Sequence, residues 1–433
     1  QHLNPNEKYI NKNSRIQDKE REMKHPKFIA LILACGAALS LRAGNESLTA
    51  SYEPRPVEGY FQFGGPETRF EPVSYRDITG RYPDADVPGL KTISYEAFPS
   101  DCDKKQEVFA YLGIPDGPVP AGGFPAVVFG HGGWGWAGPG VVDSLKKHGY
   151  VAISMSCEGC AYVKDGKHVK LKEFPGFPGY GNYRYHPQLY VRANSLLRGL
   201  PMVNKDKIAY LGQSWGAVKG SILSCVDPRF KCMVLLSGNG YWRIGDDSLN
   251  MFKDYKQIEN LDPAWYLSAA KVPIYWQSGT NDQFFGAAAW QKSVEAAPTT
   301  ENQLMLYELP HARMGRTCDR VLAAELKGEV PVPKLGPSAV KDNVVSADIL
   351  EPGKGIKSAV LCYTTDKTPF RNRKWKIAPA AIRDKTVSAK IPVGAVQYFL
   401  AVFDETGDFN KIGREGGDYQ KFCGGSSTIF TIE

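Results

Sequence analysis

A segment in the middle of the chain, residues 205–220 (KDKIAYLGQSWGAVKG), restricts the possible folds more than any other. Residues 208–211 form a short apolar run typical of a buried parallel strand, and a helix is expected from Ala217 onward. Between them, Gly212 and Gly216 lie two positions before and after Ser214. Such small residues let a strand and a helix approach closely while the serine is held on a strained corner. The G-x-S-x-G pattern is common, so an ordinary strand-to-helix turn is the alternative unless partners for Ser214 exist.

Two polar residues in other loops have the chemistry that such a serine needs. Asp282 follows the apolar run at residues 272–277, and His311 follows the run at residues 303–308. The carboxyl ends of parallel strands meet at one edge of a sheet, so Ser214, Asp282 and His311 are expected to converge there. An imidazole would take the serine proton and a carboxylate would orient the imidazole. The competing histidines have weaker positions, since His148 is expected on a helix and His168 in a lysine-rich loop.

A glycine-rich loop precedes these residues in the chain. Residues 126–129 form a buried strand, and His131-Gly-Gly133 is a sharp exit from it. Glycines allow backbone N–H groups to approach one oxygen atom closely. We therefore expect an oxyanion hole made by the amide of Gly133 or Trp134 together with the amide of Trp215. A plain glycine turn is the alternative.

Aromatic residues accompany this expected site. Residues 164–190 are rich in Pro and Gly, which oppose regular structure, and they suit a lid or a stacking surface for a ring-shaped substrate. A packed surface loop is an equal alternative. The insertion at residues 237–270 is expected to supply the rest of the pocket wall. The candidate substrate-binding residues are Trp134, Trp136, Tyr180 and Trp242.

We interpret the first 44 residues as a leader. Met23-Lys-His-Pro-Lys27 is basic and the following residues 28–34 are apolar, which is typical of a signal peptide starting near Met23. Cleavage before Cys35, with a lipid anchor there, and cleavage near Ser40 or Ala43 remain two open routes; a disordered extension is the third reading. We therefore expect export to the periplasm, the extracellular space or the bacterial envelope.

The charge distribution and the cysteine content restrict the classes of function that the chain can have. The leader carries eight Lys and Arg against four Asp and Glu, so much of the formal net charge of +7 lies there, and no basic tract with interleaved aromatics predicts nucleic-acid binding. No metal, nucleotide or flavin motif is visible, so no cofactor is expected. In an exported chain the cysteines permit disulfides, and Cys362–Cys423 is the favoured pair. Cys157 and Cys160 are expected to be a structural disulfide or a free buried pair.

The pattern changes near residue 336. After it, short strands separated by turns, without helices, predict a small β-sandwich. We therefore divide the chain into a leader (1–44), an α/β catalytic domain with an N-terminal wrapping segment (45–335) and an all-β domain (336–433). A carbohydrate-binding role for the last domain is a minor alternative to packing on the catalytic domain.

Residues 107–326 resemble the α/β-hydrolase superfamily in the motifs named above. The resemblance implies an α/β-hydrolase fold, a mostly parallel sheet with helices on both faces, with Ser214 as nucleophile, His311 as base and Asp282 as acid. More narrowly, the chain is similar to secreted bacterial proteins of acetylxylan-esterase-like, dienelactone-hydrolase-like or prolyl-oligopeptidase-like type. The segments that carry this similarity are residues 227–231, 265–267, 271–276, 279–282 and 363–375. Dienelactone hydrolases use a cysteine where this chain has Ser214, and the propeller repeats of prolyl oligopeptidases are missing here.

The predicted function is a secreted serine esterase that cleaves carboxylic esters through an acyl-enzyme, with a carbohydrate ester of acetylxylan type as substrate. The first alternative is a serine peptidase of prolyl-oligopeptidase type, which would need a charged anchor for a peptide terminus near Ser214. The second is a non-catalytic surface binding protein on a hydrolase scaffold.

Overall fold

A computed structural model of the 433-residue chain describes residues 52–57, 70–97, 106–133, 135–178, 180–244, 259–311, 316–404 and 423–431. The expected leader, with Met23 and Cys35, therefore lies outside the described residues, as do Trp134 and Cys102. The described part contains no helix that is long and apolar enough to cross a membrane.

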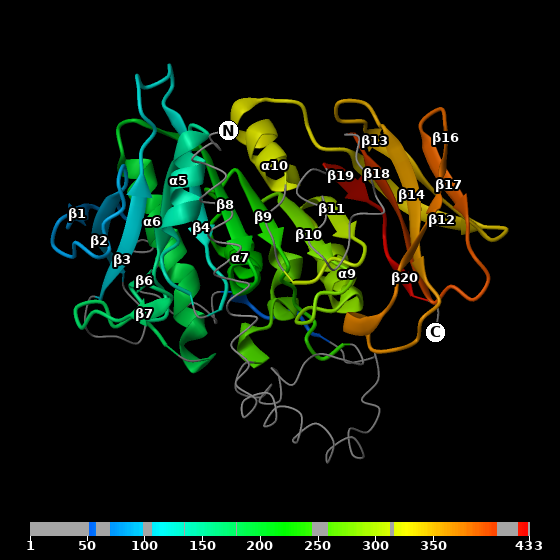
Figure 1. Cartoon of the computed structure of the whole chain (residues 1–433), viewed down its shortest axis with the longest axis horizontal. Coiled ribbons are helices and arrows are strands. Elements are labelled where there is room, and N and C mark those ends of the chain that lie inside the picture. Colours follow the sequence, from blue (N-terminus) through cyan, green and yellow to red (C-terminus); the bar gives the residue numbers. More distant parts are fainter. Residues whose placement is uncertain are drawn as a thin grey trace, which may run out of the picture.

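A nine-stranded mixed sheet forms the centre of the molecule (Figure 1). Its strands lie in the order β1-β2-β3-β5-β4-β8-β9-β10-β11. The six strands from β5 to β11 in this order are parallel, whereas β1, β2 and β3 pair antiparallel at the other side. The bounds are β1 (Tyr75–Asp77), β2 (Lys91–Ala97), β3 (Gln106–Gly113), β4 (Phe124–Gly130), β5 (Val151–Met155), β8 (Val203–Gln213), β9 (Cys232–Leu236), β10 (Ile274–Gly279) and β11 (Thr300–Leu306).

Helices cover both faces of this sheet, because its strands are apolar on both sides. In β4, Ala126 and Val128 belong to one hydrophobic cluster, and Val127 and Phe129 belong to another. The first cluster also contains residues of α6 (His186–Gly199), α7 (Trp215–Val226) and α9 (Ala287–Ala296). The second contains residues of α5 (Pro139–Lys147) and α10 (Arg316–Lys327). This confirms the expected α/β class with helices on both faces of a mostly parallel sheet.

The part of the chain expected to be a wrapping segment also supplies sheet structure. Within residues 45–99, β1 and β2 extend the central sheet beyond β3 by antiparallel pairing. In β2, Ile93 and Tyr95 are buried in the core, and the Tyr95 hydroxyl donates a hydrogen bond to the carbonyl of Leu189. The proline content of the region hid this strand from the sequence pattern.

In the two stretches expected to be irregular, the described residues, which exclude 245–258, form mainly short elements. The first contains a small hairpin of β6 (Tyr162–Lys164) and β7 (Lys167–Val169), followed by the 3-10 turn η1 (Tyr180–Tyr185). The second contains three further 3-10 turns, η3 (Glu259–Leu261), η4 (Pro263–Trp265) and η5 (Leu267–Ala269).

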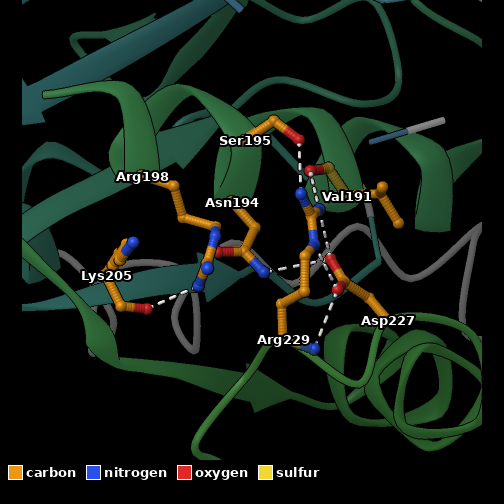
Figure 2. A network of polar contacts seen from close by, with 7 residues as sticks. All are labelled: Val191, Asn194, Ser195, Arg198, Lys205, Asp227 and Arg229. Carbon is orange, nitrogen blue, oxygen red and sulfur yellow. Dashed lines mark hydrogen bonds and ion pairs between the residues drawn. The ribbon is translucent and has the colours of Figure 1, made fainter. Parts of the chain in front are cut away.

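A buried polar network fixes the two helices that flank the turn at Ser214 (Figure 2). Arg229 donates two hydrogen bonds of 2.8 Å to the carboxylate of Asp227. It also donates to Ser195 Oγ and to the carbonyl of Val191, both on α6. Asn194 of α6 donates to Asp227 at 3.0 Å. Since Asp227 follows the last residue of α7, this network ties the end of α7 to α6.

Two antiparallel sheets form the C-terminal β-sandwich (Figure 1). The first has the order β12-β13-β17-β16, and the second has β15-β14-β18-β19 with β20 paired to β18. Side chains of both sheets, such as Val345, Val387, Leu361 and Leu400, share one hydrophobic cluster. The bounds are β12 (Lys334–Lys341), β13 (Val344–Glu351), β14 (Ser358–Thr364), β15 (Lys376–Pro379), β16 (Ala381–Arg383), β17 (Thr386–Lys390), β18 (Gln397–Phe403), β19 (Gly424–Ser426) and β20 (Phe430–Thr431).

The sandwich packs against the end of the central sheet. The amide of Met305 in β11 donates to Ser426 Oγ at 2.9 Å, so β19 lies along the edge strand of the sheet. A buried ion pair adds to this interface, because Arg320 of α10 donates to both carboxylate oxygens of Asp404, at 3.2 and 2.7 Å. Covering an edge strand in this way removes an exposed row of backbone donors and acceptors.

The expected Cys362–Cys423 disulfide is wrong. Both side chains are buried and form no disulfide, and they belong to different hydrophobic clusters, Cys362 to the first and Cys423 to the second. Cys157 and Cys160 are also free: Cys157 donates to the Tyr190 hydroxyl and Cys160 to the carbonyl of Tyr162. Burial raises the pKa of Cys157 to about 11, so its thiol stays protonated at neutral pH.

Candidate active site

Ser214 lies on a strained turn between β8 and α7. Its φ of 56° and ψ of −122° are unusual for a residue with a side chain. A Cβ atom at Gly216 would lie 2.0 Å from the carbonyl oxygen of Gly130, and one at Gly212 would lie 2.5 Å from that of Gly216. The turn therefore requires glycine at both positions, which is the physical reason for the G-x-S-x-G pattern.

The structure brings Ser214, His311 and Asp282 together. His311 Nε2 lies 2.8 Å from Ser214 Oγ, and His311 Nδ1 lies 2.9 and 3.0 Å from the two carboxylate oxygens of Asp282. A carboxylate only accepts hydrogen bonds, so Nδ1 carries the imidazole proton. Nε2 is then left to accept the hydrogen bond of the serine hydroxyl.

The Asp282 side chain is held in this orientation by its own loop. It is fully buried, and its Oδ1 atom accepts hydrogen bonds from the amides of Phe284 at 2.9 Å and Phe285 at 3.0 Å. The amide of His311 donates to the side-chain oxygen of Gln283 at 3.1 Å. The loop after β10 therefore orients the carboxylate and also fixes the backbone of His311.

Two aromatic rings beside His311 escaped the sequence analysis. The ring of Phe284 lies 4.7 Å from the imidazole in an edge-on arrangement, and that of Phe285 lies at 5.8 Å. The side chain of His311 is consequently only 15 % exposed. The only sequence signal was that both residues lie within three positions after Asp282, and a pair of phenylalanines has many other uses in a core.

The glycine-rich loop after β4 passes directly against the turn. A Cβ atom at Gly132 would lie 3.2 Å from Ser214 Cβ, and one at Gly133 would lie 2.7 Å from Cδ1 of Trp215. Trp215 is the first residue of α7, so its amide is among those that point out of the helix N-terminus. Of the predicted oxyanion donors, Gly133 and Trp215 thus lie beside Ser214, and Trp134 lies outside the described residues.

His131, the first residue of that loop, is buried behind it. Its Nδ1 atom contacts the carbonyl of Gly132 at 2.7 Å, and a Cβ atom at Gly135 would overlap its ring. Burial, with a contribution from the nearby cation of Lys219, lowers the pKa of His131 to about 3. It is therefore neutral at neutral pH, which suits a structural side chain better than a base.

The remaining predicted substrate-binding residues, Trp242, Trp136 and Tyr180, lie in different parts of the structure. Trp242 is 2 % exposed, and its ring lies 5.6 Å from that of Trp215. Trp136 is partly buried against the ring of His168 on β7, at 4.7 Å. Tyr180 begins η1, and its side chain lies outside the described part of the chain. Tyr183, one of the aromatic residues in the stretch 164–190, contacts Trp215 at 4.9 Å.

Asp262 supports the wall that carries Trp242. Its carboxylate accepts hydrogen bonds from the amides of Tyr241 and Trp242, at 2.8 and 3.0 Å, and from the hydroxyl of Tyr52 at 2.9 Å. Burial outweighs these hydrogen bonds and raises the pKa of Asp262 to about 6. The position of Trp242 behind Trp215 therefore depends on a carboxylate that titrates in a mildly acidic range.

A buried lysine lies against Tyr183, the ring that contacts Trp215. Lys219 of α7 is 2 % exposed, its Nζ atom lies 4.8 Å from the ring centre of Tyr183, and it lies 3.9 Å from Glu158 Oε1. Burial lowers its pKa. No group of three or more His, Cys, Asp or Glu side chains within the described ranges could hold a metal ion.

Comparisons with known proteins give structural neighbours at low identity. No family model matches the chain, and neither does any curated protein. Acetyl xylan esterase from Paenibacillus sp. R4 is similar with a TM-score of 0.46 and 15 % identity, over 61 % of this chain and 93 % of that one. Acetyl xylan esterase 1 from Thermoanaerobacterium sp. JW/SL YS485 has a TM-score of 0.49 and 11 % identity, over 64 % and 95 %. Dipeptidyl peptidase 4 from Porphyromonas gingivalis has a TM-score of 0.41 and 14 % identity, over 55 % and 35 %.

Topology identifies the fold more directly than these scores do. From β2 to β11 the strand order has one crossover, β3-β5-β4, and the turn with Ser214 follows the strand beside β4. Asp282 and His311 lie on the loops after β10 and β11, in the chain order Ser, Asp, His. The described chain therefore has the α/β-hydrolase fold, followed by a β-sandwich.

Proposed function

We propose that this protein is a serine hydrolase that cleaves carboxylic esters through an acyl-enzyme. The observation that carries the proposal is the position of His311, whose Nε2 faces the hydroxyl of Ser214 while its Nδ1 faces Asp282. A serine hydroxyl is a weak nucleophile, and this arrangement supplies the base that activates it.

Acylation begins when Ser214 Oγ attacks the ester carbonyl carbon and its proton passes to His311 Nε2. The amides of Trp215 and of Gly133 or Trp134 would donate hydrogen bonds to the negatively charged oxygen of the tetrahedral intermediate. The intermediate then breaks its bond to the alcohol, which leaves with the proton from His311. Water, deprotonated by the same imidazole, attacks the acyl-serine and releases the acid and the free hydroxyl of Ser214. Asp282 keeps the imidazole in the required tautomer and stabilises its positive charge throughout.

We propose an acylated carbohydrate, of the acetylxylan type, as the natural substrate. The resemblance of the sequence to acetylxylan-esterase-like proteins supports this choice, and two of the structural neighbours bear that name. The expected export of the chain agrees with a polymeric substrate outside the cell. A peptidase of prolyl-oligopeptidase type would need a charged group for a peptide terminus, and the buried Lys219 is already faced by Glu158.

The test is acetate release from acetylated xylan and from p-nitrophenyl acetate, with Ser214→Ala as control. We expect both substrates to be turned over, and the variant to lose on the order of 10⁴-fold or more in kcat while it keeps the melting temperature of the unmodified protein. Turnover of the aryl ester alone would keep the serine hydrolase and move the natural substrate elsewhere, with peptides tested next. No turnover, together with no labelling of Ser214 by a fluorophosphonate, would favour a non-catalytic binding protein.

A further inference from the structure

The β-sandwich contacts both loops that carry the partners of Ser214. The contacts come from the connection between β14 and β15, residues 365–375, which we name the strap. It contains the 3-10 turn η6 (Phe370–Asn372), and the ring of Phe370 faces Gly286 at the start of α9, where a Cβ atom would lie 3.4 Å from it. The strap is far from Asp282 in sequence and next to it in space.

The loop of Asp282 is tied to the strap by the preceding residue. Asn281 is 3 % exposed, and its Nδ2 atom donates hydrogen bonds to the carbonyls of Arg371 at 3.2 Å and Arg373 at 2.7 Å. Both donor hydrogens of this amide are thereby used on strap backbone. The hydrogen bonds of the Asn281 side chain go to the strap and to Thr280, so its contacts concern position and not chemistry.

The loop of His311 is tied to the same strap. A carboxylate oxygen of Glu308 accepts a hydrogen bond of 3.1 Å from the amide of Trp375. Glu308 has a φ of 52°, a conformation that is costly for a residue with a side chain. Trp375 itself is 5 % exposed and packs in the core, which gives this end of the strap a firm anchor.

A third hydrogen-bonded residue joins the two loops. Thr280 Oγ1 accepts from the amide of Glu308 at 2.7 Å and donates to Oδ1 of Asn281 at 2.9 Å. These hydrogen bonds run from Trp375 through Glu308, Thr280 and Asn281 to Arg373. Because Arg373 and Trp375 both belong to the strap, they form a closed ring. Neither loop can shift without breaking a hydrogen bond to the strap or to the other loop.

The strap is stiff enough to serve as a support. The carboxylate of Asp366 accepts from the amides of Thr368 at 2.9 Å and Lys374 at 3.1 Å, and the Thr368 amide in particular holds the pKa of Asp366 below its usual range. Thr364 Oγ1 donates to the carbonyl of Lys374 at 2.8 Å. Arg373 adds a hydrogen bond of 2.7 Å to Gln397 on β18.

We propose that the strap of the β-sandwich sets the distance between Asp282 and His311, with Asn281 and Glu308 as positioning residues for the hydrolytic reaction. The inference rests on the proposed function, since it assigns a role within the same site. A displacement of about 1 Å of a catalytic group can cost on the order of 10²-fold in rate. Asn281 is adjacent to Asp282 in the chain and Glu308 lies three residues before His311, so loosening either contact changes the geometry that proton transfer needs.

The first experiment compares two buried asparagines whose hydrogen bonds lie at the interface between the α/β domain and the β-sandwich. Asn302 of β11 also donates a hydrogen bond to a backbone carbonyl, that of Pro333, at 2.8 Å, but it touches neither loop. Asn281→Ala and Asn302→Ala each remove buried hydrogen bonds of the same kind. We expect Asn281→Ala to lower kcat by about 10- to 100-fold with KM within about threefold, and Asn302→Ala to leave both constants unchanged at a similar loss of melting temperature.

The second experiment keeps the proposal testable if Asn281→Ala fails to fold. Glu308→Ala removes the acceptor for the Trp375 amide, whereas Glu308→Gln keeps an oxygen at the same position. We expect the alanine variant to lose about 10-fold in kcat and the glutamine variant to restore most of it. Both substitutions keep a Cβ atom, so the backbone strain at this residue is the same in each.

A spectroscopic measurement separates positioning from general stability. The proton between His311 Nδ1 and Asp282 gives a downfield ¹H NMR signal when the hydrogen bond is short and fixed, and Asn281→Ala should shift or broaden it while Asn302→Ala does not. An unchanged signal and unchanged kcat in Asn281→Ala would refute the positioning role alone, provided that a fluorophosphonate labels Ser214 of the unmodified chain. Failure of that labelling would refute the proposed function and the positioning role with it.

Discussion

The serine and its two partners are held in place by different means. Ser214 depends on backbone packing within its own domain, because Gly212, Gly216 and Gly130 touch at the base of the turn. Asp282 and His311 lie on loops at the end of the sheet and are joined to the β-sandwich through side-chain hydrogen bonds. The first arrangement is local and tolerates almost no change of shape. The second combines contacts from far apart in the chain and can be altered one hydrogen bond at a time.

This difference follows from the places of the loops in the sheet. β8 lies in the middle, paired to β4 and β9 and covered by helices, so the turn after it has neighbours on all sides. β11 is the last strand of the sheet, and its neighbour comes from the sandwich. The loops after β10 and β11 lie beside this end of the sheet, where the strap of the sandwich contacts both.

The largest effect in this comparison is expected from Asp282→Asn. The amides of Phe284 and Phe285 would hold the asparagine oxygen, which turns its NH₂ group toward His311 Nδ1. Nδ1 would then have to accept a hydrogen bond, and the proton would move to Nε2, where it blocks proton transfer from Ser214. We expect kcat for p-nitrophenyl acetate to fall about 10⁴-fold with little change in melting temperature. A loss smaller than about 10-fold would show that Asp282 does not set the tautomer.

Gly216→Ala tests the turn at Ser214, which is the rigid part of the site. The added methyl group would lie 2.0 Å from the carbonyl oxygen of Gly130, so β4 and α7 must separate. We expect a loss of about 3 kcal/mol in the free energy of unfolding, measured by urea denaturation, together with a strong loss of kcat.

Gly140→Ala is the matched control for that substitution. Gly140 lies in the first turn of α5, and a Cβ atom there would meet nothing within 4 Å. We expect this variant to gain about 0.5–1 kcal/mol in the free energy of unfolding, because alanine restricts the unfolded chain and favours the helix. Equal effects of the two substitutions would contradict the tight packing at the Ser214 turn.

The turn at Ser214 could be predicted from the sequence more completely than the support of the Asp282 and His311 loops. The turn at Ser214 is encoded within five consecutive residues, and Asp282 and His311 could be chosen because each follows an apolar strand. The strand β4 and the helix after Ser214 were predicted for the same reason, since their patterns are local. The β-sandwich was visible as a series of short strands, although its first strand, β12, lacks the usual pattern. In β12, Gly336 and Pro337 resemble a linker, and the pairing with β13 shifts register there.

Other contacts between distant segments could not be predicted. The pairing of Asn281 with the strap joins residues about ninety positions apart, and an asparagine before an aspartate has no distinctive pattern. The favoured Cys362–Cys423 disulfide failed for the same reason: membership of one domain does not put two thiols into the same hydrophobic cluster. The positions of Phe284 and Phe285 beside His311 also depend on where β11 ends relative to β10, which is a tertiary property.

A last expected effect, on the pH dependence of stability, concerns Asp262, which supports the wall that carries Trp242 and belongs to neither side of the comparison. Its pKa is raised from 3.8 to about 6, so between about pH 4 and pH 6 the folded protein binds a proton that the unfolded chain has released. Its contribution to the free energy of unfolding is therefore fully present below pH 4 and is lost as the pH rises through 6, by up to about 3 kcal/mol. Asp262→Asn cannot titrate, and the difference between its urea stability and that of the unmodified chain should change with pH in this window and stay constant above about pH 7. A constant difference from pH 4 to pH 8 would show that the carboxylate of Asp262 is charged throughout, held so by the amides of Tyr241 and Trp242.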